Sequence, residues 1–336
     1  MSSPVDASDI RLQQLRDWVA NACGSIQSWQ VASADASFRR YFRVRTNAAT
    51  TAVIVMDAAP EQEDSRPFVD IAARLRAAGL HVPEVLAQDL ERGFLLLSDL
   101  GEQTYLHALT ADNADRLYQD AINALLQMQI HADVNGLPDY DAALLQRELD
   151  LFSDWFLQTH LQLSLSAAER ADLDQVFALL IARALAQPRV FVHRDFMPRN
   201  LMLSNPNPGI LDFQDAVIGP ISYDLICLFK DAFISWPQAR IDDWVNDYEQ
   251  RARAAGLPLP PRNDFHQDLD WMGLQRHLKV LGIFARIRHR DGKPHYLADA
   301  GRFVEYICAV TPKYPELAPL QALFEQRIMP LLDRQS

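Results

Sequence analysis

The stretch "FVHRDFMPRN", residues 191–200, directly follows Val190 and extends a short apolar run. It places a histidine, two arginines, an aspartate and an asparagine after what reads as a short buried strand. Both a solvated turn and a catalytic loop would produce such a cluster. The sequence on either side therefore has to decide between the two interpretations.

The first hundred residues are predicted to form a sheet with helices. Apolar spacing and turn residues predict, in order, a helix, a strand meander, a second helix and two strands joined by a turn, over residues 10–22, 28–58, 64–79 and 83–101. Gly24 and Gly79 are positioned to end the two helices.

The sequence after Gly101 is mostly helical. Three amphipathic patterns follow, over residues 113–132, 144–161 and 166–186, and Ser166 with Glu169 has the spacing of a capping box. Helical patterns resume at Tyr223. Between them, "SNPNPG" predicts a tight turn joining two short apolar runs, and hence an embedded β-hairpin. We expect an α+β protein with one lobe over residues 1–100 and a larger helical lobe over 101–336.

Within the embedded hairpin, His193-Arg194-Asp195 is followed by Asn200 and then by Asp212. This spacing matches the catalytic loop of kinases, in which the aspartate accepts a proton from the acceptor hydroxyl. Asn200 and Asp212 supply hard oxygen ligands for Mg²⁺, and Asp195 is left to orient the nucleophile. His193 is expected to brace the loop, whereas for Arg194 the spacing does not distinguish a brace from a phosphate neighbour.

Further segments resemble the aminoglycoside phosphotransferase-like small-molecule kinases: "LHVPEVLAQD", "GFLLLSDLG", "FVHRDFMPRNLML" and "GILDFQDAVIGPISYDLICLF". Within that group, "ADASFRRYFRV", "AVIVMDAAPEQED" and "LQRHLKVLGIFARI" look like the bacterial N-acetylmuramate/N-acetylglucosamine anomeric kinases of cell-wall recycling. The resemblance implies a bilobal protein-kinase-like fold, ATP with Mg²⁺, and phosphoryl transfer to the 1-hydroxyl of an amino sugar.

The same resemblance places the nucleotide in the first lobe. Backbone groups of Ser98, Asp99 and Leu100 would bind the adenine. The turn "SADAS", residues 33–37, corresponds to the glycine-rich hairpin of kinases but has no glycine; its small residues and the Ser37 hydroxyl can still approach an anion.

One expected cation is missing from the nucleotide site. Met56 occupies the position of the phosphate-binding lysine of kinases, and Asp70 matches the acidic residue that normally pairs with it. Either an arginine of the 39–45 strand replaces the lysine, for which Arg40 is the candidate, or the protein binds nucleotide poorly. Alternation along the strand puts Arg40 on the opposite face from the arginines at 39, 43 and 45.

The acceptor site is expected after the second strand of the hairpin and in the following helices. Gln214 and Asp215 can hydrogen-bond sugar hydroxyls or an acetamido group, and Asp215 could equally support the magnesium ion. A lactyl carboxylate would require a cation, for which Lys230 and Arg276 are candidates. Long basic side chains on helices are more often solvated.

Composition limits the partners. The formal net charge of −12 argues against a surface that binds nucleic-acid phosphates. The sequence shows no secretory leader and no apolar run long enough for a bilayer, so we expect a cytoplasmic protein without membrane or obligate protein partners, acting on a small-molecule amino sugar.

Two other functions fit the same motifs. One is a kinase for another small molecule, such as an aminoglycoside, choline or an amino acid, whose cationic acceptor would require several carboxylates. The other is a nucleotide-binding module without turnover, which the methionine at position 56 would explain.

Overall fold

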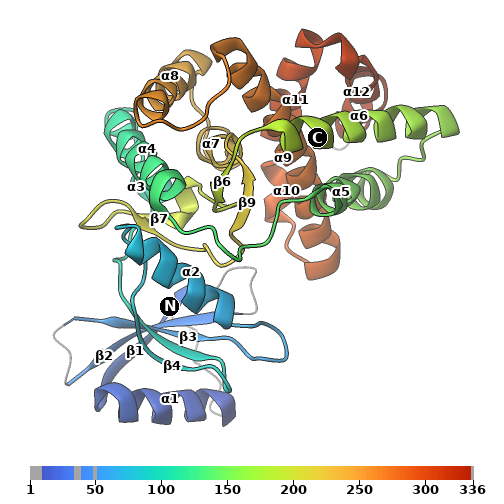
Figure 1. Cartoon of the computed structure of the whole chain (residues 1–336). Coiled ribbons are helices and arrows are strands. Elements are labelled where there is room, and N and C mark those ends of the chain that lie inside the picture. Colours follow the sequence, from blue (N-terminus) through green and yellow to red (C-terminus); the bar gives the residue numbers. More distant parts are fainter. Residues whose placement is uncertain (1–9, 34–38, 48–50, 334–336) are drawn as a thin grey trace. The chain divides into compact units, whose positions relative to one another are not determined.

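The computed structural model describes residues 10–33, 39–47 and 51–333, and the chain divides into two compact units (Figure 1). Unit 1 extends to Ala108 and includes Leu201–Asp215. Unit 2 consists of Leu109–Asn200 and the chain from Ala216 onward. The sequence predicts a single boundary at residue 100, whereas the segment that follows Asn200 groups with the N-terminal unit.

Unit 1 contains the strands and helices predicted for the first hundred residues. In chain order they are α1 (Ile10–Cys23), β1 (Ile26–Ser33), β2 (Arg40–Thr46), β3 (Val53–Asp57), α2 (Arg66–Ala77), β4 (Val85–Asp89), β5 (Phe94–Ser98) and α3 (Tyr105–Ala108), joined later by β7 (Leu201–Met202) and β8 (Gly209–Ile210). The first five strands form one antiparallel sheet in the order β1-β2-β3-β5-β4.

The two faces of this sheet differ. Alternate residues of β2, β3 and β5 pack against α1 in a core of Leu12, Leu15, Val19, Phe42, Val44, Val53, Val55, Phe94 and Leu96. The intervening residues, including Tyr41 and Met56, therefore belong to the opposite face. Figure 1 shows α2 on that opposite side of the sheet.

The predicted turn at Gly93 depends on glycine. Its φ is +71°, and a Cβ at this position would lie 1.7 Å from the carbonyl oxygen of Ala58. The turn joins β4 to β5 and so fixes their pairing.

Unit 2 is mainly helical. Its elements are α4 (Ala114–His131), α5 (Ala142–Leu151), the π-helix η1 (Phe152–His160), α6 (Ala167–Ala186), β6 (Arg189–Val192), the 3₁₀ turn η2 (Pro198–Asn200), β9 (Val217–Pro220), α7 (Tyr223–Phe229), α8 (Gln238–Ala254), α9 (Arg262–Asp291), α10 (His295–Ala298), α11 (Ala300–Val310), η3 (Thr311–Lys313), η4 (Pro315–Leu317), α12 (Ala318–Leu323), η5 (Phe324–Ile328) and α13 (Met329–Leu332).

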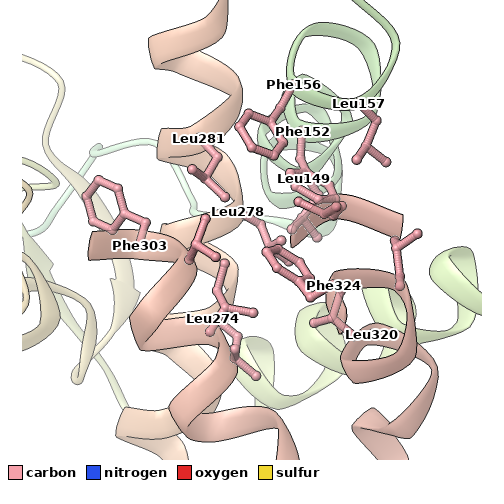
Figure 2. Close-up of a cluster of buried hydrophobic side chains, with 14 of the residues drawn as sticks. Leu149, Phe152, Phe156, Leu157, Leu274, Leu278, Leu281, Phe303, Leu320 and Phe324 are labelled. Carbon is pink, nitrogen blue, oxygen red and sulfur yellow. The ribbon is translucent and has the colours of Figure 1, made fainter. Parts of the chain in front are cut away.

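Helix α9 runs through the core of unit 2. Its Leu274, Leu278 and Leu281 pack among side chains of α5, η1, α11 and α12 (Figure 2). The predicted capping box starts α6: Ser166 Oγ accepts from the backbone N–H of Glu169 at 3.2 Å, and the Glu169 carboxylate accepts from that of Ser166 at 2.7 Å. Both contacts satisfy N–H groups that a helix start leaves without partners.

The single predicted hairpin is two nested hairpins. The turn over residues 204–209 joins β7 to β8, as the sequence predicts, but these strands have only two residues each. The strand before the polar stretch, β6, pairs instead with β9, with Val192 opposite Val217. Residues 193–200 make no ladder because their backbone groups are used elsewhere. Strand β6 therefore pairs with β9, which follows Asp212 in the sequence.

Within residues 10–33, 39–47 and 51–333, no helix has both the length and the apolar composition needed to cross a bilayer.

Helix packing in unit 2 can be tested at Gly282. An added Cβ would lie 2.3 Å from the carbonyl carbon of Leu151 and 2.6 Å from the nitrogen of Phe152, both backbone atoms that cannot move aside easily. We expect Gly282→Ala to lower the free energy of unfolding by about 1–3 kcal/mol. Chemical denaturation measures it.

Gly301 in α11 is the matched control, because a Cβ added there would have no neighbouring atom within 4 Å. There the alanine should raise the free energy of unfolding by up to about 1 kcal/mol through better helix propensity. Equal effects of the two substitutions would contradict the close approach of α9 to η1.

Candidate active site

The loop 193–200 begins where β6 ends, and Asp224 of α7 anchors it. The Asp224 carboxylate accepts from the backbone N–H groups of His193 at 2.7 Å and Arg194 at 3.0 Å. Asp224 is completely buried; burial raises its pKa to about 7, although the two N–H groups and Arg276 act to lower it. One buried side chain thus satisfies two backbone donors that have no strand partner.

Arg194 has a φ of +75°, which is unfavourable for a residue with a side chain. The surrounding structure holds it there. Its guanidinium donates to Glu148 at 2.7 Å, and Glu148 also pairs with Lys279 at 2.8 Å. Glu148 further accepts from Tyr140 and from Gln275. Arg194 is therefore a brace of the loop, one of the two roles the sequence left open.

Glu148 is the centre of a buried charge cluster. Burial alone would raise its pKa, but the charges of Lys279 and Arg194 lower it to about 2. The same carboxylate raises the pKa of both cations, against the effect of burial. The cluster is ionised across the neutral pH range and fixes Arg194 in place.

Asp195 and Asn200 are linked within the loop. Asn200 Nδ2 donates to the backbone carbonyl of Asp195 at 2.9 Å. Because the amide nitrogen faces this carbonyl, the amide oxygen of Asn200 points away from it. His193 Nδ1 accepts from the Asp195 backbone N–H at 3.2 Å, so His193 braces the loop as expected. The Asp195 side chain is half-buried.

Asp212 and the two predicted sugar-binding residues lie in unit 1. Asp212 is exposed and has a φ of +64°, and Gln214 Nε2 donates to its carboxylate at 3.0 Å. Phe213 packs on Phe68 of α2 with ring centroids 4.8 Å apart, which fixes the adjacent Asp212. Asp215 is exposed. Gln214 therefore contacts the candidate metal ligand itself.

The connector, residues 98–100, which is predicted to bind the adenine, is held by contacts within unit 1. The Ser98 hydroxyl accepts from the Glu84 backbone N–H at 2.8 Å. Asp99 accepts from Arg43 at 2.6 and 3.0 Å, and its carboxylate also accepts from the Gly101 N–H. Leu100 is buried.

The remaining nucleotide candidates differ in their surroundings. Arg40 lies on the α1 face of the sheet, where it and Arg11 pair with the buried carboxylate of Asp57. Asp70 pairs with Arg74 at 2.9 Å, one helical turn away. Ser37 lies outside the described residues.

The two predicted acceptor cations are buried within unit 2. Lys230 lies 3.9 Å from Asp270. Arg276, only 3% exposed, donates to Cys227 Sγ at 2.9 Å, and the Cys227 thiol contacts the carbonyl of Arg194. Arg276 therefore supports the loop through Cys227. The helical spacing of its segment does not predict this role.

Asp231 is a further carboxylate near the loop, and the spacing of the motif does not predict it. It is 1% exposed, and burial raises its pKa to about 6, although Arg276 and Arg199 act to lower it. Arg199 also stacks over Phe233, with 5.0 Å between the guanidinium carbon and the ring centroid. Residues 230–233 thus lie beside the loop.

Asn200 and Asp212 stay candidate ligands for magnesium, and their chemistry suits this ion. Mg²⁺ commonly takes one or two protein oxygens and completes its shell with phosphate and water. Asn200 carries an amide oxygen, and Asp212 carries a carboxylate. In the described part of the chain, no group of three or more His, Cys, Asp or Glu side chains could hold a metal ion.

The charge cluster can be tested through pH. Folding lowers the pKa of Glu148 from 4.5 to about 2. Its ionised form therefore stabilises the fold by about 3 kcal/mol above pH 4.5, and this contribution is lost as the pH falls from 4.5 toward 2. We expect the difference in unfolding free energy between wild type and Glu148→Gln to be largest near pH 7 and to shrink toward pH 3.

Denaturant titrations at several pH values measure this difference, with Glu91→Gln, at an exposed turn, as the control. A difference for Glu148→Gln that stays constant with pH would show that the carboxylate is not the ionised partner of Arg194 and Lys279.

Comparison with known proteins identifies the family of this chain. Residues 28–262 match the phosphotransferase enzyme family. The N-acetylmuramate/N-acetylglucosamine kinase of Pseudomonas putida is 55% identical over 330 residues, covering 95% of this chain and 97% of that protein. The protein of the same name from Neisseria meningitidis is 43% identical, covering 88% and 90%.

Solved structures share the fold at low identity. Choline kinase LicA from Streptococcus pneumoniae has a TM-score of 0.63 at 13% identity, covering 89% of this chain and 99% of that one. The ADP-bound aminoglycoside phosphotransferase APH(2'')-Ib has a TM-score of 0.59 at 16% identity, covering 90% and 98%. The predicted α+β, protein-kinase-like fold is confirmed. This chain belongs to the phosphotransferase enzyme family.

Proposed function

We propose that this protein is an ATP-dependent sugar kinase that phosphorylates the anomeric 1-hydroxyl of N-acetylmuramate and N-acetylglucosamine, in the recycling of cell-wall sugars. The observation that carries the proposal is the 55% identity, over 95% of the chain, to a kinase named for these two sugars. The likeness to choline and aminoglycoside kinases, at 13% and 16% identity, supports the fold but not their acceptors.

In the proposed reaction the sugar hydroxyl oxygen attacks the γ-phosphorus of ATP. The bond between that phosphorus and the β–γ bridging oxygen breaks, ADP leaves with the bridging oxygen, and Asp195 accepts the hydroxyl proton. The anomeric hydroxyl is more acidic than an ordinary alcohol, so a carboxylate such as that of Asp195 is a strong enough base to accept its proton.

The other predicted residues have supporting roles in this proposal. Asn200 and Asp212 would hold Mg²⁺, which neutralises charge on the phosphate oxygens. Backbone groups of residues 98–100 would bind the adenine, and Gln214 and Asp215 would face the sugar. Arg276 would support the loop that carries Asp195 through Cys227, and Lys230 would pair with the carboxylate of an anionic acceptor.

The acceptor is tested with the purified protein, Mg·ATP and a panel of N-acetylmuramate, N-acetylglucosamine, kanamycin and choline. We expect ADP release with the two sugars only. A ³¹P NMR signal from a phosphate at carbon 1, with loss of the sugar's reducing end, would identify the position. Turnover with a cationic acceptor alone would contradict the proposal. ATP binding without turnover of any acceptor would favour the alternative function, a nucleotide-binding module without catalytic activity.

Asp195→Asn tests the proton acceptor. The substitution keeps the size of the side chain but removes its basicity, so we expect kcat to fall by about 10²–10⁴-fold while ATP affinity is kept. Steady-state kinetics and calorimetric titration with ATP measure the two effects. Asp172→Asn, on an exposed position of α6, is the control. Full activity of Asp195→Asn would rule out this residue as the base.

A further inference from the structure

Strand β3 offers no cation at the place where kinases carry their phosphate-binding lysine. Met56 is fully buried, and its cross-strand neighbours are Tyr41 of β2 and Leu95 of β5. Any cation that replaces the lysine on this face of the sheet must therefore come from outside β3.

The arginines of β2 lie on both faces. Arg40 is on the face that α1 covers, since it precedes Phe42 and Val44 by two and four positions and pairs with Asp57. Arg43 shares the face of Tyr41, but its cross-strand neighbour is Ile54 and not Met56, and its guanidinium contacts the Asp99 carboxylate and the Gly101 carbonyl. Arg45 is exposed. None of these three adjoins Met56.

Arg39, directly before β2, does reach that region. It is 8% exposed and pairs with Glu63, just before α2, at 2.7 Å. Its charge lowers the pKa of the hydroxyl of Tyr41, which is the cross-strand neighbour of Met56. A buried arginine thus lies two residues before the cross-strand neighbour of Met56, and it pairs with Glu63, which precedes α2.

Asp212 lies near the same hydroxyl. Burial raises the pKa of Tyr41 to about 12; the charge of Arg39 lowers it, whereas those of Asp212 and Glu63 raise it. Phe213 on Phe68 brings this segment against α2 independently. A cation, its acidic partner and the candidate metal ligand, all within unit 1, therefore act electrostatically on the same hydroxyl.

We propose that Arg39, oriented by Glu63, is the phosphate-binding cation of the nucleotide site and replaces the missing lysine of β3. This inference rests on the proposed kinase function. The planar guanidinium can hold one carboxylate and still present N–H groups to phosphate oxygens, a geometry that a lysine cannot reproduce. Glu63 is then a positioning residue that holds the guanidinium at 2.7 Å.

The test compares the affinity for ATP with that for adenosine, measured by calorimetry. A charge-assisted contact to phosphate predicts that Arg39→Gln weakens ATP binding about 10- to 100-fold and leaves adenosine binding unchanged. Arg39→Lys, which keeps the charge, should recover part of the loss. Arg45→Gln, at the exposed arginine of the same strand, should bind both ligands as the wild type does.

A second variant covers the case in which Arg39→Gln does not fold because Glu63 is left unpaired. The double variant Arg39→Gln/Glu63→Gln removes both charges together, and it should show the same selective loss of ATP affinity. Wild-type ATP affinity in either folded variant would overturn the inference. So would a selective loss in Arg40→Gln alone.

The outcomes separate the inference from the proposed function. If Arg39→Gln binds ATP normally while the wild type phosphorylates both sugars, the function stands and the inference fails. If ATP affinity depends on Arg39 but the wild type phosphorylates neither sugar, the inference stands and the proposed acceptor fails.

Discussion

The paired hydrogen bonds from His193 and Arg194 to Asp224 are the constraint on which the rest of the candidate site depends. The loop leaves the β6 ladder at this point, and its backbone donors would otherwise be buried without partners, at a cost of about 1–3 kcal/mol each. With the donors satisfied, Arg194 can hold an unfavourable φ, and the loop turns so that Asp195 and Asn200 are linked.

Buried charged side chains hold the backbone of this protein in one conformation at several places. Glu148 pairs with both Arg194 and Lys279, and Arg276 reaches the loop through Cys227. A buried ion pair contributes little net stability compared with apolar packing, but it is costly to break, so it holds one conformation. In unit 1, Arg43 with Asp99 and Arg39 with Glu63 fix the connector and the β2 end in the same way.

The sequence predicts much of the fold because the patterns are local. Apolar periodicity gives the helices, glycines mark the turns at 79 and 93, and the capping box marks the start of α6. The pairing of β6 with β9 is not local, so the sequence predicted the hairpin of β7 and β8 but not this second pairing. The roles of residues 195, 200 and 212 follow from motif spacing and stay predictions. Asp224 was detectable as the only charge in the apolar helix α7, whereas Glu148 and Arg39 depend on partners far away in the chain.

The most direct measurement of the central claim is amide hydrogen exchange in a peptide spanning residues 191–197, for wild type and Asp224→Ala. If Asp224 fixes the loop that carries Asp195, the wild-type amides of His193 and Arg194 exchange slowly. They should exchange at least about 10-fold faster in the variant, while β2 and β3 keep their protection. Equal protection of the peptide in both proteins would contradict the account.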